Sequence, residues 1–231
     1  MSGNLFREVY RTKKINTLLI DIDPQFNLTQ LLMTRAKYDN ILTEKKTIYS
    51  VFQHESPDSV FAVSEDYHLN IPEIESLVTK LKKLTVSDGD GGSVEKTLHL
   101  LAGDFDLAKL NLKGSNELRI PRKPFIKFVD AARKKYDLVT IDCNPSTSFL
   151  TKCALEVSTH ILIPVRPDKY SMLGVEMIHH FVKIYLGDSL IPDLKILLND
   201  IPKYAGPKII ARSLRSDDTY GKLQYRKTHL F

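Results

Sequence analysis

The sequence predicts an α/β fold, a doubly wound and mainly parallel sheet with helices on both faces, and three observations support this prediction. Several short segments are apolar on consecutive residues, which is typical of strands buried on both faces. Amphipathic helical patterns alternate with these segments along the chain. The length of 231 residues, with 42% hydrophobic residues, suits one domain that buries a core without disulfides.

Five segments are predicted as strands. They are residues 18–21, 98–101, 138–142, 161–165 and 196–199. The ligand crevice of a doubly wound sheet lies at the carboxyl ends of its strands. The side chains expected to project into that crevice are Asp21, Asp23, Asp142 and Asn199.

Three segments are predicted as helices. Apolar residues recur at i, i+3, i+4 and i+7 over 74–81 and again over 125–132, and a third helical pattern covers 172–186. Three lysines of the first pattern, Lys80, Lys82 and Lys83, are interpreted as its solvated face. The glycine-rich residues 87–93 are interpreted as a surface loop, because they lack the lysine of a phosphate loop.

The net charge of +5 favours a polyanion as partner, although it also favours solubility alone. Basic residues gather after residue 206. Those expected to contact DNA phosphates are Lys208, Arg212, Arg215, Lys222, Arg226 and Lys227. A solvated basic surface is an equally good interpretation of this segment.

Two further features narrow the class of protein. Cys143 and Cys153 are too few for a disulfide framework and lack metal-site spacing, so both are interpreted as core thiols. No apolar run is long enough to span a bilayer, and the first residues lack the apolar stretch of a secretory signal. A cytoplasmic protein without membrane contact is therefore expected.

Two of the predicted strands end in aspartate. A hydrophobic strand that ends in aspartate, as 138–142 does, has the form of a Walker B strand, whose carboxylate reaches Mg²⁺ through water. One such strand is weak support, since strands also end in aspartate for a turn or a helix cap. The same ending at 18–21, with Asp-Pro-Gln after it, strengthens the interpretation that these aspartates belong to a magnesium site.

These motifs resemble those of the ParA/MinD class of P-loop ATPases, and specifically the ParA-type partition proteins. The family signature LLIDxDPQ.N.T is similar to LLIDIDPQFNLT at 18–29, and YDxxxIDCPPS is similar to YDLVTIDCNPS at 136–146, where Asn144 replaces the first proline. Residues 47–52, 98–108 and 161–174 resemble further family segments. The resemblance covers about residues 15–200, in the family's order.

The resemblance implies a role for individual residues. Asp23 would orient the attacking water, and Asp21 and Asp142 would hold the magnesium shell. Pro167 and Asn199 would border the adenine. For the whole protein it implies ATP and Mg²⁺ as cofactors, a homodimer bound to nonspecific DNA in the nucleoid, and a ParB-like partner that stimulates hydrolysis.

The family's phosphate loop, KGGxGKT, does not occur in the 231 residues. The only Gly-Lys pair is Gly221-Lys222, and leucine follows it. Residues 1–14 are too few for the strand, loop and helix that carry this motif. We therefore expect one ParA-like domain over 1–231, shortened at both ends. In place of the first strand we expect an open sheet edge or a partner that fills it. We also expect ATP hydrolysis to be undetectable. The alternative is a non-enzymatic remnant that binds DNA or a partner.

Overall fold

The computed structural model describes residues 12–53, 71–87, 92–112, 119–144, 146, 148–165, 169–186, 193–198 and 209–211. The chain divides into two compact units, Met1–Ala154 and Leu155–Phe231. Each unit contains its own sheet, and each is described by itself.

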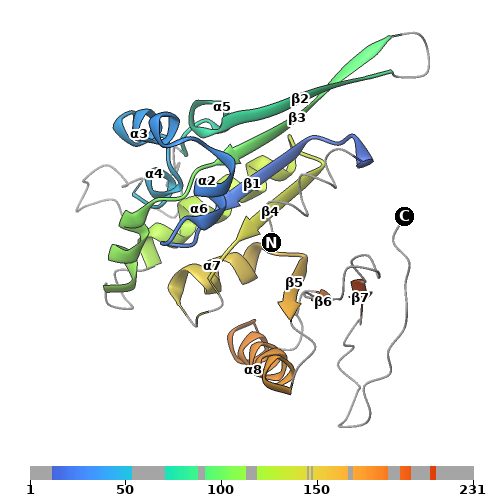
Figure 1. Cartoon of the computed structure of the whole chain (residues 1–231). Coiled ribbons are helices and arrows are strands. Elements are labelled where there is room, and N and C mark those ends of the chain that lie inside the picture. Colours follow the sequence, from blue (N-terminus) through green and yellow to red (C-terminus); the bar gives the residue numbers. More distant parts are fainter. Residues whose placement is uncertain are drawn as a thin grey trace, which may run out of the picture. The chain divides into compact units, whose positions relative to one another are not determined.

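The first unit is built on a four-stranded, mostly parallel sheet (Figure 1). The strands in sheet order are β2 (Thr79–Ser87), β3 (Ser93–Leu101), β1 (Thr17–Asp21) and β4 (Leu138–Asp142). The central strand β1 is parallel to both β3 and β4, whereas β2 is antiparallel to β3. All five residues of β1 are buried, as the continuous apolar run predicts.

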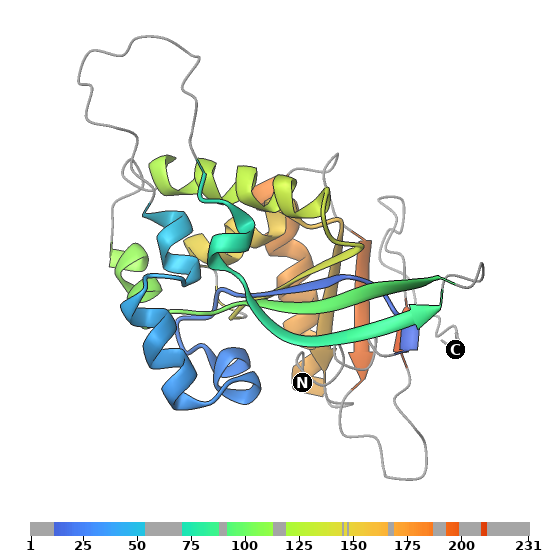
Figure 2. The ribbon, with the colours of Figure 1, turned by 90° about the horizontal axis from the view of Figure 1, so that it is seen from above.

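Helices cover both faces of this sheet, so the α/β class is confirmed. Figure 2 shows α2 (Asn27–Leu32) and α3 (Arg35–Thr43) on one side of the strands, and α4 (Ile48–Phe52) and α6 (Arg119–Arg133) on the other. The shorter elements are α5 (Ile74–Leu77) and the 3₁₀ helix η1 (Phe105–Leu112), and α7 (Phe149–Val157) follows β4.

The core has a layer on each face, because successive side chains of a strand point to opposite sides. Leu19 of β1 packs with Leu98 and Leu100 of β3 and with Leu28 of α2. On the α6 side, Phe125 is fully buried and its ring stacks on that of Phe52 with centroids 4.9 Å apart. Burying a phenylalanine of this kind contributes about 1.5–3 kcal/mol.

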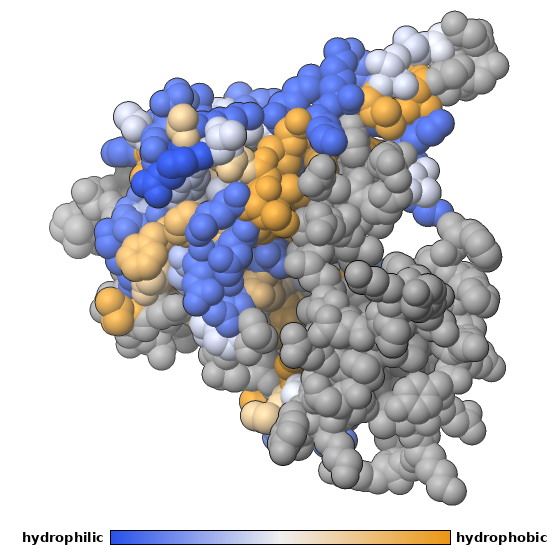
Figure 3. Space-filling model, viewed as in Figure 1, coloured by the Kyte–Doolittle hydropathy of each residue, from blue (hydrophilic) through white to orange (hydrophobic). Residues whose placement is uncertain are grey.

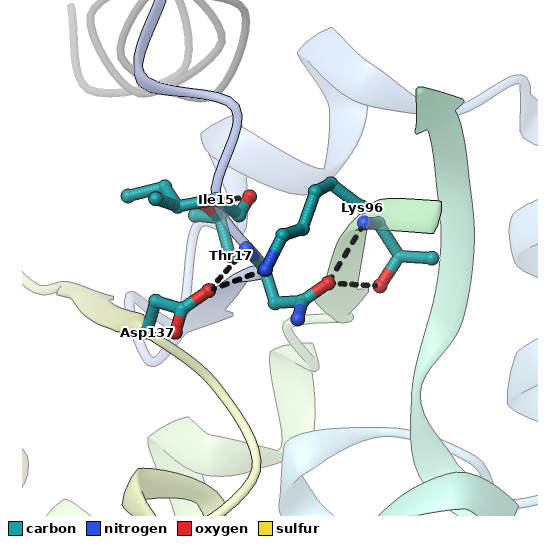
Figure 4. A network of polar contacts seen from close by, with 6 residues as sticks. Ile15, Thr17, Lys96 and Asp137 are labelled. Carbon is teal, nitrogen blue, oxygen red and sulfur yellow. Dashed lines mark hydrogen bonds and ion pairs between the residues drawn. The ribbon is translucent and has the colours of Figure 1, made fainter. Parts of the chain in front are cut away.

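A polar network fixes the amino end of β1 between its neighbours (Figure 4). The backbone N–H of Asn16 donates to Asp137 at 2.8 Å, and the Asn16 side-chain oxygen accepts from the Thr97 N–H at 3.0 Å. Lys96 lies 3.6 Å from the same Asp137 carboxylate. These contacts hold β1 in register with both β3 and β4, which sets where its carboxyl end lies.

The helix predicted over 74–81 is wrong beyond its first turn. The helix α5 ends at Leu77, Val78 is extended, and β2 begins at Thr79. Leu81 and Leu84 pack on the β1–β3 core cluster, and β2 pairs with β3 along its whole length. The long hairpin satisfies backbone groups that a short surface helix would expose, so tertiary pairing overrides the helical spacing.

The lysines assigned to that helix therefore lie on a strand. Lys80, Lys82 and Lys83 are exposed on β2. Figure 3 shows hydrophilic surface over α3 and over part of β2. Lys83 forms a cross-strand ion pair with Glu95. The glycine-rich segment predicted as a loop joins β2 to β3, although residues 88–91 lie outside the described residues.

The second unit has a three-stranded sheet in the order β5 (His160–Val165), β6 (Asp193–Leu198), β7 (Ile209–Ala211). The strands β5 and β6 are parallel, and β7 is antiparallel to β6. Helix α8 (Lys169–Leu186) packs on β5, so the helix predicted over 172–186 and the strand over 161–165 are confirmed. None of the helices in the described ranges is both long and apolar enough to cross a membrane.

Candidate functional site

The carboxyl ends of β1 and β4 bring two of the predicted site residues side by side. Asp21 and Asp142 are register partners as the last residues of the two parallel strands. The Ile22 N–H donates to the Asp142 carbonyl at 2.9 Å and continues the ladder by one step. Two carboxylates therefore leave the same edge of the sheet, next to the turn that contains Asp23.

Asp21 is buried within a network of hydrogen bonds. Its side chain has no exposed area, and Oδ2 accepts from the Thr29 N–H at 2.8 Å and from the Thr29 hydroxyl at 2.7 Å. Its Oδ1 accepts from the Asp23 N–H at 3.3 Å. Burial, aided by the nearby Asp142 carboxylate and opposed by the Thr29 hydrogen bonds, raises the pKa of Asp21 to about 7.

Thr29 and Gly103 complete this network, and the sequence analysis gave neither a role. The Gly103 N–H donates to the Thr29 hydroxyl oxygen at 2.8 Å, so Thr29 links β1 to the segment after β3. A Cβ at Gly103 would lie 2.6 Å from the Cβ of Phe26 and 3.0 Å from the Asp21 carboxyl carbon. Only glycine fits this close approach. We call the Asp21, Thr29 and Gly103 group the β1–β3 brace.

Part of this brace could have been found from the sequence. Thr29 is the last residue of the quoted 18–29 motif, and Gly103 lies within the matched segment 98–108. In the sequence, both positions support only the resemblance to the ParA-type family and indicate no structural role. Nothing local in either segment indicates that a threonine hydroxyl would bridge an aspartate and a distant glycine N–H.

Asp23 lies in a tight turn between β1 and α2. Its Oδ1 accepts from the Gln25 N–H at 2.9 Å, and its carbonyl accepts from the Phe26 N–H at 2.8 Å. Phe26 has φ 41°, a left-handed conformation that is uncommon for a residue other than glycine. Its ring stacks on Tyr38 with centroids 5.1 Å apart, which holds the turn in this conformation. The half-buried Asp23 is thus presented on a fixed support.

The pKa of Cys143 reflects the nearby carboxylates of Asp142 and Asp23. Burial raises the pKa of its thiol to about 11, and the charges of Asp142 and Asp23 raise it further in the same direction. The thiol therefore remains protonated at neutral pH. Cys153, the other cysteine, is fully buried as predicted, whereas Cys143 is only half-buried by its exposed area.

A second buried contact braces the neighbouring turn. The Thr47 hydroxyl donates to Asp104 Oδ2 at 2.6 Å, and the Asp106 N–H donates to Asp104 Oδ1 at 2.8 Å. The Ile48 N–H donates to the Ala102 carbonyl at 2.9 Å. Two sequence segments that resemble the family, 47–52 and 98–108, therefore meet at this turn.

The donor set at this edge fits magnesium only together with further ligands. In the described part of the chain, no group of three or more His, Cys, Asp or Glu side chains is arranged to hold a metal. The two oxygens of Asp21 already accept hydrogen bonds within the protein. Asp23 Oδ1 likewise accepts from the Gln25 N–H, and Mg²⁺ is commonly bound by one or two carboxylates together with waters and substrate phosphates.

The other predicted site residues are not among those whose structure is described. Pro167 and Asn199, assigned to the adenine, lie outside the described residues. The same holds for the six basic residues assigned to DNA, Lys208, Arg212, Arg215, Lys222, Arg226 and Lys227. Their roles stay predictions.

Comparison with known proteins identifies relatives. Residues 2–196 match the AAA domain family AAA_31. The chromosome partitioning protein ParA of Myxococcus xanthus is 30% identical over 183 residues, which are 78% of this chain and 51% of the relative. The sporulation initiation inhibitor protein Soj of Bacillus subtilis is 25% identical over 168 residues, 72% of this chain and 53% of the relative. The chain thus spans about half the length of these two relatives.

Solved structures share the fold. A plasmid partition protein from Borrelia burgdorferi has a TM-score of 0.64 at 18% identity, covering 88% of this chain and 75% of that one. A B. burgdorferi B31 partition protein bound to AMPPNP has a TM-score of 0.63 at 18% identity, covering 87% and 70%. The pNOB8 ParA bound to nonspecific DNA has a TM-score of 0.53 at 16% identity, covering 86% and 62%. The chain therefore belongs to the AAA domain family AAA_31, and it is similar to ParA-type partition proteins.

Proposed function

We propose that this chain is a ParA-like partition protein, which acts in the segregation of a plasmid or chromosome while associated with nonspecific DNA. The observation that carries the proposal is the edge formed by Asp21, Asp23 and Asp142, held by the β1–β3 brace, in a chain of the ParA type. Relatives named as chromosome partitioning proteins support the cellular role. A ParB-like partner and a homodimer are parts of the same proposal.

The residues of this edge have separate roles in the proposal. Asp142 would hold the magnesium shell and Asp23 would orient the water that attacks the terminal phosphate, since both carboxylates lie at the same end of the sheet. Asp21 is kept as the second residue of the magnesium shell, and the hydrogen bonds from Thr29 and from the Asp23 N–H would hold its carboxylate in place. Magnesium, when bound with ATP, would neutralise charge that develops on the phosphates. Pro167 and Asn199 are kept as the adenine border.

Nucleotide binding in the fold is supported by neighbours, one bound to AMPPNP and one, a cobyrinic acid a,c-diamide synthase from Mycobacterium smegmatis, bound to ADP and magnesium. The 231 residues contain no KGGxGKT motif. Phosphoryl transfer depends on backbone N–H groups and lysines that cradle the phosphates. We therefore expect this chain by itself to show no ATP turnover above an Asp23→Ala control, measured as phosphate release with magnesium present.

A second candidate function follows from the same absence of a phosphate loop among these residues. The chain would then bind DNA or a partner without any nucleotide chemistry. Phosphate release by the wild-type chain that Asp23→Ala removes would contradict this candidate and support the enzyme. No release from either protein, combined with DNA binding, would favour the binding module.

Two experiments test the partition role itself. Deleting the gene is expected to raise the fraction of daughter cells that lack the replicon encoding it, and unchanged inheritance would contradict the proposal. The purified chain is expected to be retained with duplex DNA on a filter at low salt and released as salt rises, because counterions are displaced from phosphates. An absence of retention at low salt would remove DNA from the proposal.

A further inference from the structure

We propose that the exposed face of α6 is a contact surface for the phosphate backbone of duplex DNA, separate from the basic carboxyl-terminal segment. This inference rests on the proposed association with DNA and adds a surface to it. We call the exposed lysines Lys123, Lys127 and Lys134 the α6 lysine stripe.

The first argument is the charge of this helix. Residues 119–135 contain one acidic side chain, Asp130, among many basic ones. The basic residues are Arg119, Arg122, Lys123, Lys127, Arg133, Lys134 and Lys135. An ordinary solvent-facing helix mixes both signs and pairs them three or four residues apart. This segment departs from that pattern because its basic residues far outnumber its one acidic residue, and solubility alone does not explain such an excess of positive charge.

The second argument is which of these charges are neutralised. Arg133 pairs with Asp130 at 3.2 Å, and Lys135 pairs with Glu75 of α5. Within the described ranges, no salt bridge or hydrogen bond engages the side chains of the α6 lysine stripe. Three ammonium groups, two on α6 and one directly after its last residue, are therefore available to an external anion.

The third argument is geometric. At 3.6 residues per turn, the three stripe residues lie within about 40° of one another around the helix axis. Lys134 continues the helical path, since its N–H donates to the Ala131 carbonyl at 3.2 Å. The stripe is about 16 Å long at a rise of 1.5 Å per residue. A straight row of this length suits successive phosphates along a duplex better than one compact anion.

The opposite face of α6 excludes a bilayer as the favoured partner. A helix that binds a membrane surface needs an exposed apolar face to enter the lipid. The apolar residues of α6 are used inside the protein, since Phe125, Phe128 and Ala132 are fully buried. Figure 2 shows α6 running along the outer side of the sheet, with its inner side toward the strands. Among the α6 residues whose burial is described, those that are exposed are all charged, as is typical of contact with nucleic acid phosphates.

The test compares three variants of the 231-residue chain in binding to a fluorescent duplex of about 40 base pairs, at salt concentrations between about 50 and 200 mM. The α6 variant carries Lys123→Gln, Lys127→Gln and Lys134→Gln. A control with the same loss of charge carries Lys37→Gln, Lys45→Gln and Lys82→Gln, at exposed lysines of α3, the following turn and β2. A third variant carries Arg212→Gln, Arg215→Gln and Lys222→Gln. Circular dichroism and thermal unfolding establish that each variant is folded.

The α6 variant is expected to bind at least about tenfold more weakly than wild type at low salt. The slope of log affinity against log salt should become shallower by about 2.7, which is about 0.9 for each phosphate that the stripe no longer neutralises. The control variant should lose less than about threefold. Loss of affinity in the carboxyl-terminal variant as well would show that basic residues of both segments contribute to binding.

Several results would overturn the inference. Wild-type affinity and salt slope in the α6 variant would exclude the stripe, and so would an equal loss in the control variant, which would mean a general effect of charge. If the α6 variant loses binding to vesicles containing phosphatidylserine while its DNA binding equals that of wild type, the stripe would be assigned to a membrane instead. If wild type itself fails to bind DNA, the proposed function fails together with this surface, whereas the first three results leave the proposed function intact.

Discussion

Thr29→Val tests the β1–β3 brace directly. The substitution keeps the size of the side chain and removes the hydroxyl that donates to Asp21 at 2.7 Å and accepts from Gly103 at 2.8 Å. A hydrogen bond to a charged group contributes about 1.5–3 kcal/mol, and a buried N–H left without a partner costs about 1–3 kcal/mol. We expect the free energy of unfolding to fall by about 4 kcal/mol at pH 8, where Asp21 is mostly ionised.

Urea unfolding followed by circular dichroism measures this loss. For a slope of about 2 kcal/mol per molar urea, the midpoint should fall by about 2 M. At pH 5, where Asp21 is protonated, the loss should shrink to about 2–3 kcal/mol, because only neutral hydrogen bonds remain. The control is Thr43→Val, an exposed threonine whose hydroxyl donates to the Asp39 carbonyl at 2.9 Å, with an expected loss below about 1 kcal/mol. A Thr29→Val loss as small as that of the control would refute the brace.

Three further predictions concern the same edge. Gly103→Ala should lower the free energy of unfolding by at least about 2 kcal/mol, because its Cβ would lie 2.6 Å from the Cβ of Phe26. The control Gly174→Ala on α8, whose Cβ would meet nothing within 4 Å, should be neutral or stabilising, and a urea midpoint for Gly103→Ala equal to that of Gly174→Ala would contradict the prediction. The raised pKa of Asp21, about 7, means that the folded protein keeps a proton that the unfolded chain releases near pH 4, so stability falls as pH rises from about 4 to 7, by up to about 4 kcal/mol. Asp21→Asn should remove this fall in unfolding curves collected across the window, and an unchanged pH profile would show that another group causes it. The raised pKa of Cys143, about 11, should slow its reaction with Ellman's reagent at pH 8 by about 100-fold relative to free cysteine, and rapid modification of the native protein would disprove this.

The sheet of the first unit was largely predictable from the sequence. The run that forms β1 is apolar on consecutive residues, and a strand covered on both faces requires that pattern. The spacing over 125–132 likewise placed Phe125 and Phe128 on the buried side of α6. In both segments the local pattern and the tertiary environment favour the same structure, so the pattern alone is sufficient.

The hairpin β2–β3 shows where this reasoning fails. The leucines near residue 80 fit a helix by spacing, but Leu81 and Leu84 also pack on the β1–β3 core from a strand. A short apolar pattern is compatible with both periods, and the choice depends on whether a partner strand is available. That partner, β3, is the second strand of the hairpin and cannot be recognised from the spacing of residues 74–81.

The site was predictable in its location and not in its internal contacts. Aspartates at the ends of β1 and β4 indicated the correct edge, because parallel strands end together. The sequence could not indicate that Asp21 would turn inward to Thr29 while Asp23 stays half-exposed. Two carboxylates two residues apart look equivalent in a sequence, and only the packing of α2 on β1 distinguishes them.

The lysines of β2 have a consequence for the protein in solution. Among the strands that the structure describes, β2 is the last in the order of its sheet, so its outer edge could template a strand from another molecule and begin an aggregate. Lys80, Lys82 and Lys83 are exposed along this strand, and an added strand would crowd their ammonium groups and strip them of water. The irregular pairing between Lys80 and Lys82 further disturbs the regular edge that such growth needs. The lysines therefore disfavour the addition of a further strand at this edge, and with it the association of the hairpin with the hairpins of other molecules.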